Sequence, residues 1–190
     1  MWSVKSHFLE FNVHCMEDVV LLTNRNKFME KIKAHKLGLK HYAFSIIIFN
    51  IENEMLLQQR ALTKYHSGGL WSNACCGHPL SVDSISHIKH QAIQRLFEEL
   101  GFTTDIHYQC TCEYKFMCSG LIENEVDYVF TGLYTGDDIQ PDKNEVNSYK
   151  WTSLEELKKD ILNNPDRYTS WFKFIVNNYP LMQEIIHYQF

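Results

Sequence analysis

A short segment between residues 71 and 79 holds the residue types best suited to chemistry. It reads Trp-Ser-Asn-Ala-Cys-Cys-Gly-His-Pro and follows a glycine-bearing loop. In an extended segment, side chains two residues apart point to the same face, so Cys76 and His78 would address one cavity. A thiol beside an imidazole is a recurring catalytic or metal-binding pair. The adjacent Cys75 would point the opposite way, and we predict that it is structural.

Histidines and glutamates elsewhere in the chain indicate a metal site. The segment Glu123-Asn124-Glu125 leads into a predicted strand, and in extended chain residues two apart share a face. His35, His41 and His78 stand near strand ends or loops. Three imidazoles and two carboxylates would make a mixed nitrogen and oxygen site that suits Mn²⁺, Fe²⁺ or Zn²⁺. The competing interpretation is that the paired glutamates form a solvated strand face.

Two glutamates at the end of the clearest predicted helix indicate a second charged site. Glu98 and Glu99 are followed by Leu-Gly-Phe, which matches the closing half of a Nudix box, where helix carboxylates hold a divalent cation against a diphosphate. Gln94 and Arg95 stand where that motif has Arg-Glu, so we predict a diphosphate that is bound without being hydrolysed. The diphosphate could be held by the cationic side chains of Lys31, Arg60, Lys64 and Arg95. Each of them could alternatively be a solvated surface charge.

The composition is that of an ordinary globular domain. The chain has 190 residues, of which 45% are hydrophobic and 22% are charged, so residues 1–190 are predicted to form one domain. The net charge of -5, with interspersed signs, argues against nucleic-acid binding. The longest apolar run, from Ile46 to Phe49, is far short of the ~20 residues of a membrane span. Met1 to Glu10 has no apolar signal segment, and the six cysteines form no spaced framework, so we expect a cytoplasmic protein with reduced thiols.

The hydrophobic pattern predicts the elements that must position these residues. Strands are predicted at Asp18–Thr23, His41–Asn50, Met55–Arg60, Ile106–Cys118, Glu125–Tyr134 and Asn147–Trp151, with the second and third forming a hairpin. Helices are predicted at Lys27–His35, Asp83–Leu100, Leu154–Leu162 and from Trp171 to before Pro180. This order predicts an α+β fold or a mixed α/β/α sandwich.

Together these segments resemble the type I isopentenyl-diphosphate isomerases of the Nudix superfamily. The resemblance lies in His41-Tyr-Ala-Phe-Ser, Leu57-Gln-Gln-Arg-Ala, the Cys-Gly-His-Pro segment, Glu98-Glu-Leu-Gly and Glu123-Asn-Glu-Val-Asp-Tyr. It closes on Trp171-Phe-Lys, where Ser170 replaces the usual proline. It covers a core from Val19 to Val176 and implies a Nudix-type fold with additional C-terminal helices.

The resemblance also implies a reaction and its cofactors. The reaction is the interconversion of isopentenyl and dimethylallyl diphosphate in isoprenoid biosynthesis, so the partner is a small isoprenoid diphosphate and the protein is a monomer or weak homo-oligomer. One divalent metal, Mn²⁺ or Zn²⁺, would be held by a set of three histidines and two glutamates. These are His35, His41, His78, Glu123 and Glu125. A Mg²⁺ ion would bridge Glu99 to the diphosphate.

The reaction indicates what the remaining residues would do. Protonating an unactivated alkene gives a carbocation-like centre, so the pocket must be dry and have a polarisable wall. Trp71 and Trp171 are candidates for this wall, and the resemblance selects Trp171. Cys76 and Glu125 would face each other across the allylic unit, one delivering a proton and the other removing one, in either order. Tyr114 could hydrogen-bond to Glu125.

Two other functions fit parts of the pattern. A Nudix hydrolase of nucleoside or other diphosphates would share the carboxylates, but Gln94-Arg95 argues against it and Cys76 would have no role. A non-catalytic metal- or nucleotide-binding module would not need Cys76 and Glu125 opposed. Incubation with isopentenyl diphosphate in deuterated water would distinguish the three. A deuterium-labelled isomer would support the isomerase, released phosphate the hydrolase, and neither product the binding module.

Overall fold

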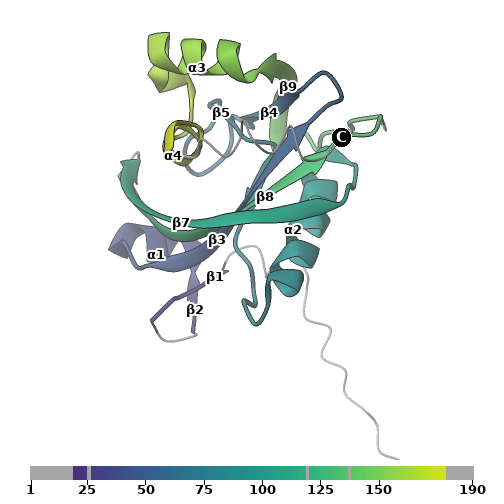
Figure 1. Cartoon of the computed structure of the whole chain (residues 1–190). Helices are drawn as coiled ribbons and strands as arrows, with labels where there is room; N and C mark the ends of the chain where they lie inside the picture. Colours follow the sequence, from purple (N-terminus) through teal and green to yellow (C-terminus); the bar gives the residue numbers. More distant parts are fainter. Residues whose placement is uncertain (1–18, 25–26, 119, 137, 179–190) are drawn as a thin grey trace, which may run out of the picture.

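One mixed β-sheet forms the centre of the molecule (Figure 1). The computed structural model describes residues 19–24, 27–118, 120–136 and 138–178. The strands of this sheet are β3 (His41–Phe49), β4 (Glu54–Arg60), β5 (Trp71–Ser72), β6 (Cys75–Gly77), β7 (Ile106–Cys118), β8 (Leu121–Leu133) and β9 (Val146–Ser153). The order is β5-β4-β3-β8-β7, with β6 on β3 and β9 on β4. Only the β3–β8 pair is parallel among the pairs of this sheet.

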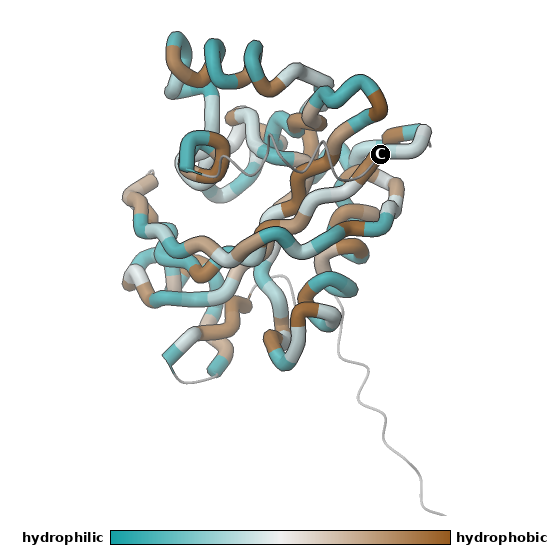
Figure 2. Tube along the Cα trace, viewed as in Figure 1, coloured by the Kyte–Doolittle hydropathy of each residue, from teal (hydrophilic) through white to brown (hydrophobic). Residues whose placement is uncertain are grey.

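Helices cover both faces of the sheet. On one face, α2 (Ile85–Leu100) packs its Leu96 side against Ile46 and Ile48 of β3. On the other, α3 (Leu154–Asn163), a 3-10 turn at Pro165–Arg167 and α4 (Ser170–Asn178) lie over Ile47 and Phe49. Successive residues of β3 thus serve opposite cores, which explains the continuous apolar colour of the central strand in Figure 2. The predicted mixed α/β/α sandwich is confirmed.

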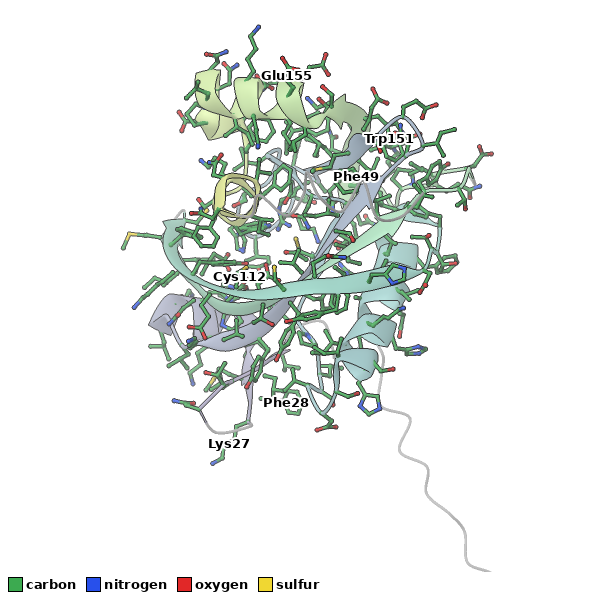
Figure 3. The ribbon with its side chains drawn as sticks, in the orientation of Figure 1. Lys27, Phe28, Phe49, Cys112, Trp151 and Glu155 are labelled. Carbon is green, nitrogen blue, oxygen red and sulfur yellow. The ribbon has the colours of Figure 1, made fainter. Side chains whose placement is uncertain are left out.

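The predicted helix Lys27–His35 is wrong in its first part. Phe28–Glu30 forms a strand, β2, that pairs with β1 (Val19–Leu21) in a separate two-stranded sheet. Helix α1 (Lys31–Leu37) begins only after Glu30, whose carboxylate accepts hydrogen bonds from the first backbone N–H groups. Gly38 ends it in the left-handed conformation, with φ 61°. Figure 3 shows Phe28, in β2, at the opposite end of the molecule from Glu155 of α3.

The remaining predicted elements are present with small boundary changes. The capping box at the start of α3 is formed by Ser153 and Glu156. Strand β8 begins at Leu121, four residues before the predicted start, so Glu123 and Glu125 both lie within it. Residues 1–18, Ser119 and Pro180, to which parts of the predictions refer, lie outside the described residues.

The predicted hairpin between β3 and β4 is paired only next to its turn, at Phe49 and Met55. Further along, β6 takes the edge of β3, where Cys76 lies opposite Ser45. The strands therefore diverge, and the gap between them admits the Cys-Gly-His segment to the centre of the sheet.

Among the described residues, no helix is long and apolar enough to cross a bilayer.

Candidate active site

Strand β6 separates the two adjacent cysteines onto opposite faces of the sheet. Cys75 is fully buried in the core beneath α2. Cys76 lines a cavity of about 760 Å³ on the other face. Its Sγ lies 3.2 Å from Asn73 Oδ1 and 3.6 Å from Ser45 Oγ. Burial, with the nearby charge of Asp127, raises the pKa of Cys76 to about 12. The structure thus gives the two thiols different surroundings, as the alternation predicts.

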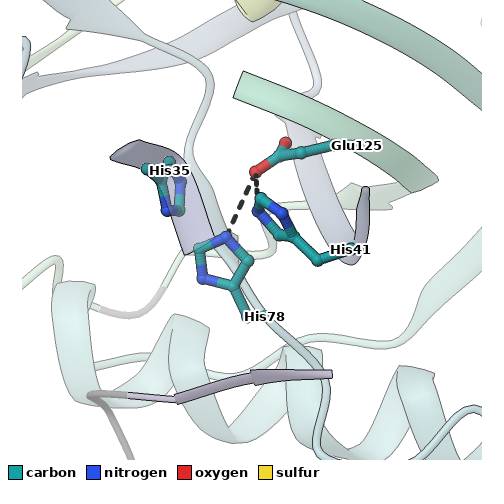
Figure 4. Close-up of side chains that lie close together, drawn as sticks. All are labelled: His35, His41, His78 and Glu125. Atoms are coloured by element: carbon teal, nitrogen blue, oxygen red, sulfur yellow. Dashed lines mark hydrogen bonds and ion pairs between the residues drawn. The ribbon is translucent and has the colours of Figure 1, made fainter. Parts of the chain in front are cut away.

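The predicted metal ligands gather beside this cavity, which His78, Glu123 and Glu125 line. His41 Nε2 and His78 Nε2 lie 3.2 and 3.1 Å from one oxygen of Glu125 (Figure 4). His35 Nε2 lies 3.2 Å from Glu123 Oε2. Ligand atoms of His35, His41, His78 and Glu125 are all within 4.8 Å of one another. Four side chains from α1, β3, β8 and the segment after β6 therefore present their donors to one point.

The ring orientations suit a divalent cation. His35 Nδ1 bonds to the Lys31 carbonyl oxygen at 2.7 Å, and His41 Nδ1 to the Leu39 carbonyl oxygen at 2.8 Å. Both rings therefore donate through Nδ1 and leave Nε2 as the free ligand atom. Within the described chain, the buried Oε1 of Glu123 has no partner with hydrogen-bond geometry, although His66 Nε2 lies 2.8 Å from it. Imidazole nitrogens together with an orphaned carboxylate oxygen are the donor set that such a cation requires.

Pairing in the sheet sets the position of Glu125. It lies opposite His41 in parallel β3–β8 register and opposite Tyr114 in antiparallel β7–β8 register. The Tyr114 hydroxyl donates to Glu125 Oε2 at 2.6 Å and also lies 3.1 Å from Asp127 Oδ2. Burial alone would raise the pKa of Glu125, but the neighbouring imidazoles of His41 and His78 hold it well below its usual value. The carboxylate is thus ionised where it faces the cavity.

A hydrogen-bonded chain connects Glu125 to Cys76. From Tyr114 it continues to Asp127, whose Oδ2 accepts from Ser45 Oγ at 2.8 Å, and Ser45 Oγ lies beside the Cys76 thiol. Asp127 is fully buried, and burial raises its pKa to about 7. Sequence reasoning missed Ser45 and Asp127, although Asp127 shares a strand face with Glu125 and alternation could have found it.

The predicted phosphate-binding cations line the same cavity. They are Lys31, Arg60, Lys64 and Arg95. Arg95 lies 2.9 Å from both Glu99 and Glu145, and Lys64 also pairs with Glu145. The guanidinium carbon of Arg60 lies 5.4 Å from the centre of the Trp171 ring. Burial lowers the pKa of Lys64 to about 8. Glu145 was not predicted, since no local pattern links it to Arg95.

The end of helix α2 presents its two glutamates differently. Glu99 is buried and accepts a hydrogen bond of 2.8 Å from Gln58 Nε2. Glu98 is exposed and pairs with Gln94 and Arg95. Glu99 is therefore the buried member of the pair, held between Gln58 and Arg95, and its role as a Mg²⁺ ligand stays a prediction.

Trp171 closes the cavity on the side of α4. The ring is 5% exposed, and its indole Nε1 has no hydrogen-bond partner in the described residues. Trp71, the other candidate for the wall, lies under the Lys150 ammonium group at 4.6 Å instead. The structure therefore gives Trp171, and not Trp71, a place in the cavity lining.

The chain matches one protein family over most of its length. Residues 39–172 match the NUDIX domain. An isopentenyl-diphosphate Delta-isomerase of Serratia proteamaculans is 40% identical over 149 residues, which cover 78% of this chain and 81% of the relative. A protein of the same name from Pectobacterium atrosepticum is 38% identical over 169 residues, or 87% of this chain and 92% of that one.

Solved structures support the fold assignment. A MutT protein from Methanosarcina mazei Go1 superimposes with a TM-score of 0.57 at 20% identity and covers 77% of this chain and 94% of its own. A MutT NUDIX hydrolase from Burkholderia pseudomallei gives a TM-score of 0.55 at 16% identity, covering 73% and 96%. At these identities the likeness concerns the fold alone.

Proposed function

Because this chain belongs to the isopentenyl-diphosphate Delta-isomerases of the NUDIX fold, we propose that it interconverts isopentenyl and dimethylallyl diphosphate. The observation that carries the proposal is the placement of Cys76 and Glu125 in one cavity, joined by the hydrogen-bonded chain through Ser45, Asp127 and Tyr114. A hydrolase would need no thiol at this position.

The reaction moves a double bond by one carbon and needs two proton transfers. One of Cys76 and Glu125 delivers a proton to a terminal alkene carbon, which leaves positive charge on the tertiary carbon. The other removes a proton from the carbon on the far side of that centre, and the two electrons of the C–H bond form the new double bond. Tyr114 fixes the Glu125 carboxylate by its 2.6 Å hydrogen bond.

The wall of the cavity stabilises the cationic centre. The Trp171 indole face is polarisable and non-nucleophilic, so it attracts a desolvated cation by about 2 kcal/mol without trapping it. Its burial keeps water away from the reacting carbons.

The cations at the cavity mouth bind the diphosphate. Lys31, Arg60, Lys64 and Arg95 supply positive charge, and substrate would displace Glu145 from Lys64 and Arg95. A Mg²⁺ ion at Glu99 would bridge to the diphosphate. The second metal, Mn²⁺ or Zn²⁺, would be held by His35, His41, His78, Glu123 and Glu125, and it would keep Glu125 ionised and oriented.

The test is incubation of the metal-loaded protein with isopentenyl diphosphate and Mg²⁺ in deuterated water. Deuterium-labelled dimethylallyl diphosphate, detected by mass spectrometry, is the expected product. Released phosphate would instead support hydrolysis, and the absence of both products would refute catalysis on this substrate.

A further inference from the structure

A fourth histidine stands beside the predicted metal ligands. His66 lies in the loop between β4 and β5 and is only 6% exposed. Its Nε2 lies 2.8 Å from Glu123 Oε1, and its ring centre is 5.8 Å from that of His35. The corresponding distance between His35 and His78 is 5.7 Å. His66 is thus about as close to His35 as His78 is, although it approaches His35 and Glu123 rather than the other two histidines.

The geometry between His66 and Glu123 is that of two ligands rather than of a hydrogen-bonded pair. The atoms are within ion-pair distance, yet Glu123 Oε1 has no hydrogen-bond partner with acceptable angles among the described residues. Ligand bonds of about 2.1 Å at right angles place neighbouring ligand atoms about 3 Å apart. The short separation is therefore explained if both lone pairs face the same cation.

The other nitrogen of His66 is arranged as in the assigned ligands. His35 and His41 bond through Nδ1 to backbone oxygens, and His66 Nδ1 lies 3.2 Å from Ser67 Oγ. Metal-binding histidines hold their second ring nitrogen in a hydrogen bond. A contact in which His66 Nδ1–H donates to Ser67 Oγ leaves the Nε2 lone pair directed at Glu123 and available to a cation.

We propose that His66 is a further ligand of the metal site, shared with His35 and Glu123. This inference rests on the proposed metal site of the isomerase and extends its donor set to four imidazoles and two carboxylates. Ligand atoms of His35, His66 and Glu123 lie within 4.8 Å of one another, and His35 also belongs to the group with His41, His78 and Glu125. One cation beside His35 Nε2 would therefore adjoin both groups. Six nitrogen and oxygen donors favour an octahedral ion such as Mn²⁺, Fe²⁺ or Co²⁺ over Zn²⁺, which usually takes four.

Cobalt binding tests the assignment without relying on activity. The protein and its variants would be titrated with Co²⁺ in competition with a chelator, while the d–d absorption spectrum reports the ligand set. His66→Ala and His66→Gln should both weaken Co²⁺ binding roughly 100-fold or more and change the spectrum, since removal of even an outer partner of a ligand costs 10–100-fold. His87→Ala is the matched control, because its side chain is 64% exposed on α2.

The glutamine variant separates a ligand from a hydrogen-bond donor. Its amide can still donate to Glu123, but it lacks the imidazole nitrogen. The assignment would be overturned if His66→Gln kept the Co²⁺ affinity and spectrum of the unmodified protein. An unchanged Co²⁺ spectrum in His66→Ala would overturn it as well. Isomerase activity of the unmodified protein is measured separately, so an active enzyme with an unchanged His66→Ala spectrum refutes this inference alone.

Discussion

Exchanging each adjacent cysteine for serine should separate activity from stability. In Cys76→Ser, the new hydroxyl keeps Asn73 and Ser45 as neighbours, at the 3.2 and 3.6 Å positions of the present sulfur. The free energy of unfolding should therefore change by less than about 1 kcal/mol. Because a positioned proton-transfer group contributes roughly 100- to 10,000-fold, kcat should fall by that factor.

Cys75→Ser should have the reverse effect. The Cys75 side chain is fully buried among apolar residues beneath α2, and the Cys76 carbonyl oxygen is 3.9 Å from its sulfur. The nearby Glu99 carboxylate already pairs with Gln58 and Arg95. A hydroxyl placed there without a good partner costs about 1–3 kcal/mol of unfolding free energy. Since the side chain does not reach the cavity, kcat should remain close to that of the unmodified protein.

The assay combines two measurements on both variants. Deuterium incorporation into dimethylallyl diphosphate gives kcat, and urea unfolding gives the free energy of unfolding. The expected result is a crossed pattern, in which each variant loses what the other retains. Equal loss of kcat in both variants would refute the division of roles between the thiols.

Three further changes test other parts of the structure. Gly77→Ala would place a Cβ 2.5 Å from Phe44 Cζ. The free energy of unfolding, measured in urea, should therefore fall by about 1–3 kcal/mol. An unchanged free energy of unfolding would contradict this tight packing. Asp160 has a lowered pKa, mainly because its carboxylate accepts a hydrogen bond from Tyr168. The ionised carboxylate therefore stabilises the fold above its unfolded pKa of about 3.9. This contribution is lost as the pH falls through the lower pKa of the folded state. Asp160→Asn should thus lower Tm at neutral pH and reduce its fall in acid, and a parallel Tm curve would count against the hydrogen bond. Chelation of the metal-loaded protein should lower Tm, and added Mn²⁺ should restore it, because a cation bound only to the folded state stabilises that state. An unchanged Tm would argue against a filled metal site.

Sequence patterns predicted the sheet because a strand buried on both faces has a run of consecutive apolar residues. The strand from His41 to Phe49 ends in the unbroken apolar run Ile46–Phe49, as expected for a strand between two helical layers. The helix expected from Lys27 failed for a physical reason. Phe28 and Met29 have helical spacing to Ile32, but they pair with Val19–Leu21, and local periodicity contains no information about that partner.

The site was predictable where its residues form short motifs. Cys76 and His78 share a segment, and Glu123 and Glu125 share a strand face. His66 and Glu145 belong to no such motif, because each meets its partners only through the fold, at Glu123 and Arg95 respectively. Pairing over such sequence distances leaves no local periodic signal.

The parallel register of β3 and β8 ties metal binding to correct folding. His41 lies opposite Glu125 across 84 residues of sequence. A slip of one residue would turn both glutamates of β8 to the other face of the sheet. A cation at the proposed site could therefore bind only after this distant pairing has formed in the right register. Such binding would stabilise the correctly paired fold over misaligned pairings.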